Sequence, residues 1–127
     1  MEIKRGSVYW WNCPQHGRTH IQEGMRPAVV VSNDDCNAAS GVVTVVPFST
    51  KVKRPYPQQV AVVLDGDVSI ALCDQMTSVP VCELQRHICD LRDYQVDMID
   101  TAIAVQLGWV SPKDRPYALY PKLRGDC

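Results

Sequence analysis

Four residues of the sequence carry side chains that suit acid–base chemistry on a phosphodiester. Arg26 precedes Pro27 and the apolar run 28–31, and a residue before proline favours an extended backbone. A guanidinium held at the mouth of a rigid strand is well placed to bind a phosphate or a carboxylate. The other three candidate catalytic residues are His20, Ser49 and Asp74.

RNA hydrolysis without a metal ion requires three chemical roles, and these side chains include a group for each. A base takes the proton from the 2′-hydroxyl, an acid protonates the leaving 5′ oxygen, and donors hold the charge that grows on the non-bridging oxygens. Polar neighbours of the four candidates are expected to bind the RNA, and no cofactor is expected. These RNA-binding candidates are Gln22, Thr50, Lys51 and Gln75.

Each candidate also has an interpretation that involves no chemistry. Arg26 can pair with a surface carboxylate, a contact worth about 0–1 kcal/mol. Asp74 can accept backbone hydrogen bonds, and Ser49 and Thr50 can be ordinary turn hydroxyls. A loop histidine such as His20 is more often solvated than catalytic. The residue types alone leave both interpretations open.

Short β-strands are predicted to position these residues. Runs rich in β-branched and aromatic residues favour strands, and clusters of glycine, proline, asparagine and aspartate favour turns. The apolar run that follows Arg26 predicts a strand covered on both faces, and the long polar loop 12–24 before it is a candidate for function. The predicted strands are 3–11, 28–32, 42–48, 59–64, 68–79 as one bent or two short strands, and 87–91.

One helix is predicted near the end of the chain. Asp93 can cap its N-terminus, and Gly108 can end it after residue 107. Its apolar face is expected to pack on the strands and consists of Val96, Ile99, Ile103 and Leu107. Shorter helical turns are expected within 33–41 and at 81–85.

These elements predict a mainly β protein with a C-terminal helix, folded as a small, partly open antiparallel barrel. We assign residues 1–109 to this domain and residues 110–127, which contain Pro112, Pro116 and Pro121, to a C-terminal tail.

Composition narrows the classes of protein. The chain has 127 residues, 46% of them hydrophobic, which suits one domain with a packed core. Its formal net charge of −1 argues against a protein that coats nucleic acid by charge alone, so any nucleic-acid site must be local. The sequence has no apolar run that suits a membrane span and no signal-peptide pattern at its N-terminus. We therefore expect a cytoplasmic protein.

Six cysteines raise the question of disulfides or a metal. Without a secretory signal, reduced thiols are expected. The one metal-like spacing is Cys13, His16 and His20, with Cys36 as a distant fourth ligand. Because loop histidines are more often solvated and no Cys-x-x-Cys pair supports the spacing, we expect no metal site.

Several motifs, in order, resemble the MazF/PemK family, the toxins of type II toxin–antitoxin systems. The resemblance begins with segments 4–10, 20–27 and 29–34. It continues through the strand and hydroxyl loop 45–51, the segment 71–75 and the closing helix up to Gly108. It covers residues 3–109, and the ordered set is more specific than any single motif.

The resemblance implies a small barrel related to the CcdB-like fold that works as a homodimer. It implies a sequence-specific, metal-independent endoribonuclease that cuts single-stranded RNA and leaves a 2′,3′-cyclic phosphate and a 5′-hydroxyl. It also implies a cognate antitoxin that occludes the RNA groove.

The same resemblance assigns roles to the four candidates. Arg26 matches the family's catalytic arginine, and Ser49 stands where many members have a catalytic threonine. Asp74 matches the aspartate proposed as the base in the PemK branch, and His20 matches that branch's histidine.

Two departures from the family pattern leave alternatives open. Ile21 replaces the usual glutamate, and Leu72 replaces an arginine of the PemK branch. The first departure motivates a family member that binds RNA or antitoxin with weak catalysis. A second alternative is a CcdB-like, non-enzymatic inhibitor of DNA gyrase. Such toxins depend on a Trp-Gly pair, whereas this chain has Gly108-Trp109.

Overall fold

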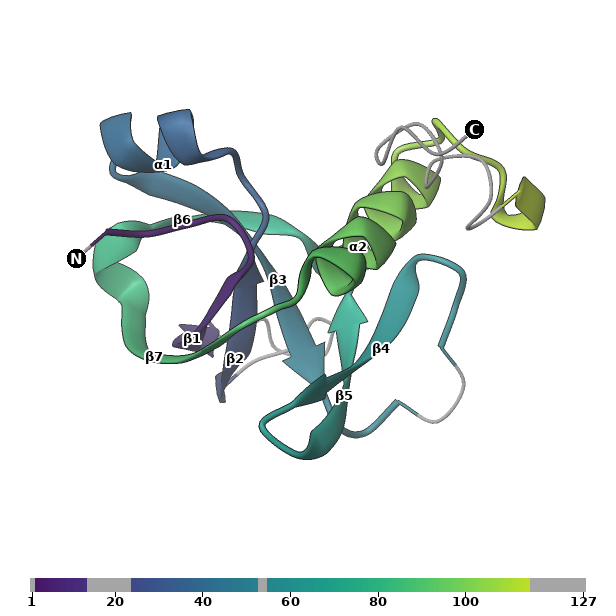
Figure 1. Cartoon of the computed structure of the whole chain (residues 1–127), viewed down its shortest axis with the longest axis horizontal. Helices are drawn as coiled ribbons and strands as arrows, with labels where there is room; N and C mark the ends of the chain where they lie inside the picture. The colour runs from purple at the N-terminus through teal and green to yellow at the C-terminus, as the bar shows by residue number, and fades with distance from the viewer. Residues whose placement is uncertain (1, 14–23, 53–54, 115–127) are drawn as a thin grey trace.

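The computed structural model describes residues 2–13, 24–52 and 55–114, and it shows a curled antiparallel sheet with a helix packed on it (Figure 1). The strands are β1 (Ser7–Cys13), β2 (Gly24–Val30), β3 (Val42–Ser49), β4 (Gln59–Leu64), β5 (Asp67–Leu72), β6 (Thr77–Pro80) and β7 (Leu84–Asp90). The helices are α1 (Asp34–Ala39) and α2 (Asp93–Gln106), with 3₁₀ turns η1 (Cys73–Gln75), η2 (Val81–Glu83) and η3 (Pro112–Asp114).

Strand β3 is the central strand of the sheet. The strand order is β4-β5-β3-β2-β1-β7, and β6 pairs with β3 away from this path. Residues 42–45 of β3 pair with β6, residues 45–47 pair with β2, and its last two residues pair with β5. One strand therefore changes partners along its length, which curls the sheet into a half-barrel. This fold confirms the predicted mainly β, partly open antiparallel barrel with a C-terminal helix.

Two apolar clusters cover opposite faces of the central strands. Successive side chains of a strand point to opposite faces, so Val29 joins one cluster and Val30 the other. The first cluster lies between the sheet and α2 and includes Phe48 and Ile99. The second cluster includes Trp11 and Val45. The continuous apolar run after Arg26 is thus covered on both faces, as predicted.

Helix α2 packs against β4 and η1, with Ile99 and Ala102 in the first cluster. Its N-terminus differs from the prediction, because Arg92 rather than Asp93 is the capping residue. The Gln95 side chain accepts a hydrogen bond of 2.9 Å from the Arg92 N–H. Gly108, at φ +80°, ends the helix in the left-handed conformation as predicted.

The predicted apolar face of α2 is partly wrong. Leu107 is 52% exposed, whereas Gln95, Thr101 and Ala104 are buried. The side of the helix that packs on the sheet therefore does not include Leu107, and it includes small and polar residues instead.

Strand boundaries also differ from the predictions. The first strand begins at Ser7 and not at residue 3, because Gly6 adopts φ +91° and turns the chain. Strand β2 begins at Gly24 and ends at Val30, four residues earlier at its start than predicted. Segment 68–79 forms two strands separated by η1, and the last strand begins at Leu84. The strand at 59–64 is as predicted, and the helical turn expected within 33–41 is confirmed as α1. The turn expected at 81–85 forms only over Val81–Glu83 as η2, because Leu84 already begins β7.

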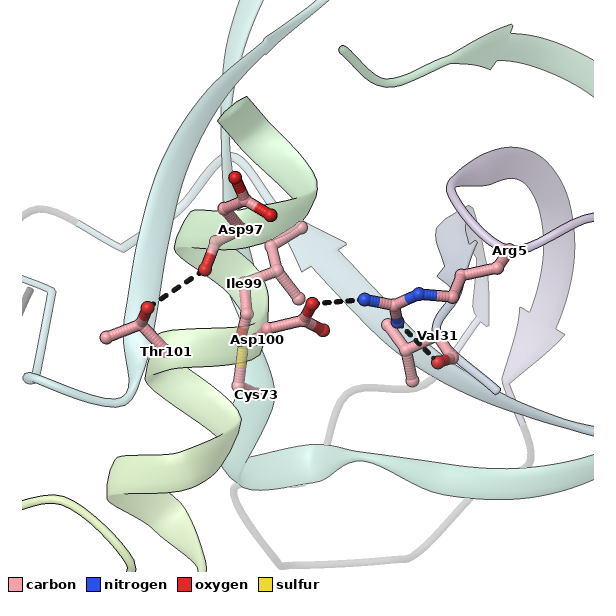
Figure 2. Close-up of polar contacts among 7 residues, drawn as sticks. All are labelled: Arg5, Val31, Cys73, Asp97, Ile99, Asp100 and Thr101. Atoms are coloured by element: carbon pink, nitrogen blue, oxygen red, sulfur yellow. Dashed lines mark hydrogen bonds and ion pairs between the residues drawn. The ribbon is translucent and has the colours of Figure 1, made fainter. Parts of the chain in front are cut away.

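Arg5 joins three parts of the fold, as Figure 2 shows for two of them. Its guanidinium pairs with the Asp100 carboxylate of α2 and donates to the Val31 carbonyl at 2.6 Å. Its backbone N–H donates to the Asp34 carboxylate at the start of α1 at 2.7 Å. One residue therefore ties the N-terminal segment to both helices and to the end of β2.

Candidate active site

A pocket of about 390 Å³ opens where the two ends of the half-barrel sheet approach each other. Strands β4 and β7 are the outermost strands of the sheet, and Leu64 of β4 and Ile88 of β7 both line the pocket. Its size is in the range of small-molecule sites, about 300–1,000 Å³. The lining residues are Trp10, Met25, Arg26, Pro27, Phe48, Ser49, Thr50, Lys51, Leu64, Asp65, Asp67, Ser69 and Ile88.

Arg26 lies at one wall of this pocket and is half-buried. It is the third residue of β2 and pairs in register with Trp11 of β1. Its Nη1 donates to the backbone carbonyl of Phe48 at 3.2 Å. The guanidinium is thus held between β2 and the end of β3, where its N–H groups suit an anionic ligand.

The hydroxyl segment Ser49–Lys51 forms the adjacent part of the wall. Ser49 is the last residue of β3, is 3% exposed, and its Oγ accepts a hydrogen bond of 3.1 Å from the Lys51 N–H. Thr50 and Lys51 are exposed. The structure therefore brings Arg26 together with the hydroxyl segment, with a guanidinium, two hydroxyls and an ammonium in one pocket.

Asp74, the candidate base, does not share the pocket with Arg26, although both are candidate catalytic residues. It lies in η1, is partly buried, and is not among the residues that line the pocket. Its two carboxylate oxygens accept from Nε2 of Gln59 at 3.3 and 3.4 Å. Gln75 lies in the same turn and is also outside the lining.

The predicted residues His20 and Gln22 lie outside the described residues, as do Ile21, Glu23 and His16. The metal-like spacing is therefore represented only by Cys13, which is buried, and by Cys36, which is exposed on α1. Within the described ranges, no group of three or more histidine, cysteine, aspartate or glutamate side chains is arranged to hold a metal ion.

Burial and the positive charge of Arg26 on the neighbouring strand β2 both affect the pKa of the Cys13 thiol on β1. Burial raises the pKa of its thiol to about 11, and the positive charge of Arg26 acts in the opposite direction. The thiol is therefore protonated at neutral pH.

Sequence reasoning missed the part of the pocket wall that comes from β4, β5 and β7. Leu64, Asp65, Asp67 and Ser69 belong to the β4–β5 hairpin, which the sequence identifies only as two strands joined by a turn. Ile88 reaches the pocket from a β-bulge, because Val8 pairs with Cys89 while Tyr9 pairs with His87. The pairing of β5 with the end of β3 and the course of the sheet bring these residues to the pocket of Arg26, so no local sequence signal marks them.

No helix in the described part of the chain has the length and apolar composition needed to cross a membrane.

Comparison with known proteins agrees with this architecture. The endoribonuclease MazF9 of Mycobacterium tuberculosis is 31% identical to the chain over 115 residues, which cover 83% of this chain and 96% of that protein. Among solved structures, a mycobacterial endoribonuclease in complex with its cognate antitoxin is similar, with a TM-score of 0.69, 25% identity, and coverage of 84% of this chain and 96% of that one.

A crystal structure of MazF from Deinococcus radiodurans has the same fold, with a TM-score of 0.73 at 24% identity, and covers 85% of this chain and 98% of that one. The family described as PemK-like, MazF-like toxin of type II toxin–antitoxin system matches residues 4–107. The chain therefore belongs to the PemK-like, MazF-like toxins of type II toxin–antitoxin systems.

Proposed function

We propose that the protein is an endoribonuclease that cleaves single-stranded RNA at a short sequence, using the pocket beside Arg26. The observation that carries this proposal is the placement of Arg26, Ser49 and Lys51 on one pocket in a member of this toxin family. The similar MazF9 protein is named an endoribonuclease, which supports the same activity here.

The chemistry assigned to the pocket is attack by the 2′-hydroxyl on the adjacent phosphate. The 2′ oxygen loses its proton to a base and forms the new P–O bond, and the 5′ oxygen leaves with a proton from an acid. The products are a 2′,3′-cyclic phosphate and a 5′-hydroxyl. Arg26 donates to the non-bridging oxygens, where negative charge grows, and the Ser49 hydroxyl adds a further donor.

Proton transfer is assigned to Asp74 as the base, with His20 assisting it, and to Arg26 as the acid that protonates the leaving 5′ oxygen, since Leu72 replaces the arginine of the PemK branch. Asp74 accepts two hydrogen bonds from Gln59 and lies outside the pocket lining. For Asp74 to act as the base, its carboxylate must come within hydrogen-bond reach of the 2′-hydroxyl. This requires either that the bound RNA extends to η1 or that η1 shifts toward the pocket. We assign phosphate and base contacts to Thr50, Lys51, Gln22 and Gln75.

We further propose that the protein works in the cytoplasm, where its RNA substrate is found, as a homodimer inhibited by a cognate antitoxin. A similar mycobacterial endoribonuclease has been solved with its cognate antitoxin, which supports this kind of partner. Inhibition of DNA gyrase is not favoured, because the curated relative and the similar structures described above are endoribonucleases or MazF proteins.

The test is incubation of the purified protein with total RNA in the presence of EDTA, followed by chemical mapping of the cleaved ends. We expect cleavage to persist in EDTA and to leave 2′,3′-cyclic phosphate ends. Intact RNA, or 5′-phosphate ends, would contradict the proposed activity or its mechanism. A DNA supercoiling assay with gyrase, expected to be unaffected, separates this function from that of the gyrase-inhibiting toxins.

A further inference from the structure

Part of the pocket wall is acidic and comes from the β4–β5 hairpin, whose strand β5 pairs with the end of β3. Asp65 and Asp67 flank Gly66 at the tip of the β4–β5 hairpin, and both line the pocket. The pleat places Asp67 and Ser69 on the pocket side of β5, while Val68 between them is 62% exposed on the other side. These two carboxylates share the pocket with Arg26.

A buried hydroxyl belongs to the same wall. Ser69 is only 5% exposed and lines the pocket, and its side chain makes no hydrogen bond within the described residues. In the same part of the chain, no completely buried side-chain nitrogen or oxygen lacks a partner. Among the described residues the Ser69 hydroxyl therefore has no hydrogen-bond partner and keeps some exposure to the pocket, which fits a polar ligand there.

The hairpin tip lies close to β7, because Asp65 at the tip and Ile88 of β7 line the same pocket. Burial raises the pKa of the neighbouring Cys89, and the negative charge of Asp65 raises it further, in agreement with this placement. Asp65 adopts φ +50°, a left-handed conformation that the short polar side chains of Asp and Asn tolerate. The turn thus fixes Asp65 at the pocket that Arg26 also lines.

Carboxylates at an RNA-binding pocket need a specific partner. They repel phosphates, so they are unfavourable beside a scissile phosphate unless they meet hydrogen-bond donors of the RNA. The strongest such donors on unstacked bases are the exocyclic amino groups of adenine, cytosine and guanine. Uracil has no amino group, and its single donor on the Watson–Crick edge, N3–H, lies between two carbonyl oxygens that a carboxylate repels.

We propose that Asp65, Asp67 and Ser69 form a base-reading subsite that binds the exocyclic amino group of the nucleotide beside the scissile phosphate and rejects uracil. This inference rests on the proposed endoribonuclease function and adds a determinant of its sequence specificity. Trp10 and Met25 line the same pocket and provide apolar surface on which the base can stack.

Asparagine is the sharpest replacement for the two carboxylates. It keeps the shape of aspartate and suits the left-handed turn, but its amide nitrogen can donate to a uracil carbonyl. The variants are therefore Asp67→Asn and Asp65→Asn. Asp35→Asn on the exposed surface of α1 removes the same charge away from the pocket and serves as the matched control.

The experiment digests a randomised RNA library with the full-length protein and sequences the cleaved ends. For the wild type we expect one position beside the cut at which uracil is disfavoured by about tenfold against an amino-bearing base. Asp67→Asn or Asp65→Asn should remove most of that preference and leave other positions unchanged. Asp35→Asn should behave as the wild type.

The outcomes separate this inference from the function on which it rests. If the wild type does not cut RNA, the proposed function fails and this subsite fails with it. If the wild type cuts but accepts uracil at every neighbouring position, or both variants keep its preference, only the subsite is wrong.

A second measurement does not depend on how well the variants fold. The wild type is given an RNA whose selected base is replaced by an analogue without the exocyclic amino group. We expect cleavage to slow by about tenfold. An unchanged rate would overturn the subsite even if neither variant can be purified.

Discussion

The guanidinium of Arg26 on β2 donates to the backbone carbonyl of Phe48 on β3 at 3.2 Å, one residue before the buried Ser49. This bond links the arginine to the end of the strand that supplies the hydroxyl, so the two groups keep a fixed relation in the pocket. A guanidinium has several N–H donors, and a bond that orients it is compatible with further contacts to a phosphate.

Ser49 provides a test of the hydroxyl's role. We expect Ser49→Ala to lower the RNA cleavage rate by about 100-fold if its hydroxyl donates to charge in the transition state. Ser49→Thr should stay within about tenfold of the wild type, since the hydroxyl remains. The extra methyl enters a site that is 3% exposed and should lower the free energy of unfolding by about 1–3 kcal/mol.

The control for this pair is Ser78→Ala on β6, an exposed serine remote from the pocket lining. Single-turnover cleavage and urea unfolding measure the two effects separately. Equal cleavage by Ser49→Ala and the wild type would remove Ser49 from the mechanism.

The Arg5–Asp100 ion pair is expected to stabilise the joint between the N-terminal segment and α2. Both side chains are mostly buried, with 29% and 19% exposed, so removal of one leaves a charge poorly solvated. We expect Asp100→Ala to lower the free energy of unfolding by about 1–3 kcal/mol in urea titrations. Asp35→Asn, on the exposed face of α1, should change it by less than about 0.5 kcal/mol.

Replacement of both partners sharpens this prediction. Arg5→Met with Asp100→Leu leaves no unpaired charge, so the double variant should be more stable than the sum of the single effects predicts. Additive effects would show that the two side chains do not depend on each other.

The sequence predicts the features that depend on neighbouring residues, and it does not predict the features that depend on contacts between distant segments. The apolar run after Arg26 predicts a buried strand, which the structure has in β2. The apolar residues before Ser49 predict a second buried strand that ends at a hydroxyl, which the structure has in β3. The spacing of Asp65, Gly66 and Asp67 predicts a hairpin turn, which also forms. These are local patterns, and tertiary packing does not alter them.

The rest depends on the curvature of the sheet, which no local pattern encodes. The β4–β5 hairpin brings Asp65 to the pocket of Arg26, and a bulge turns Ile88 into the same pocket. Asp74 lies outside the lining and against Gln59, because Gln59 pairs in register with Leu72, two residues before Asp74. The predicted apolar face of α2 is wrong at Leu107, because helical spacing shows which residues share a face but not how far the sheet covers that face.

The buried thiol of Cys13 should react more slowly than the exposed thiol of Cys36. The thiolate is the nucleophile, and burial raises the pKa of Cys13 to about 11 despite the opposing charge of Arg26. In a short treatment with iodoacetamide at pH 8, mass spectrometry should find Cys36 and Cys82 modified and Cys13 unmodified. Rapid modification of Cys13 in the folded protein would contradict its buried position.

The same shift predicts a loss of stability in alkali. The pKa of Cys13 in the folded state lies above the ordinary 9.0, so the folded state holds the proton more tightly. The contribution of the Cys13 thiol to the free energy of unfolding is complete below pH 9 and is lost as the pH rises toward 11. Cys13→Ala should therefore show a flatter decline of the free energy of unfolding over that range.

Asp90 should contribute to stability with the opposite dependence on pH. Hydrogen bonds from His87 and then Ser7 hold the pKa of Asp90 below its ordinary 3.8. Its contribution is therefore present above pH 3.8 and is lost as the pH falls through the lower folded-state value. Asp90→Asn should flatten the fall in thermal midpoint below about pH 4, and Asp35→Asn should not. Identical acid limbs for Asp90→Asn and the wild type would contradict the assignment.

The central claim is that Arg26 stabilises the transition state of RNA cleavage. The most direct test is the single-turnover rate on one RNA oligonucleotide in EDTA for the wild type, Arg26→Ala and Arg86→Ala. Arg86 is exposed on β7 and is not among the residues that line the pocket, so it is the matched control for loss of an arginine. We predict that Arg26→Ala is slower by about 10²–10³-fold while Arg86→Ala matches the wild type. Equal rates for Arg26→Ala and the wild type would contradict the account.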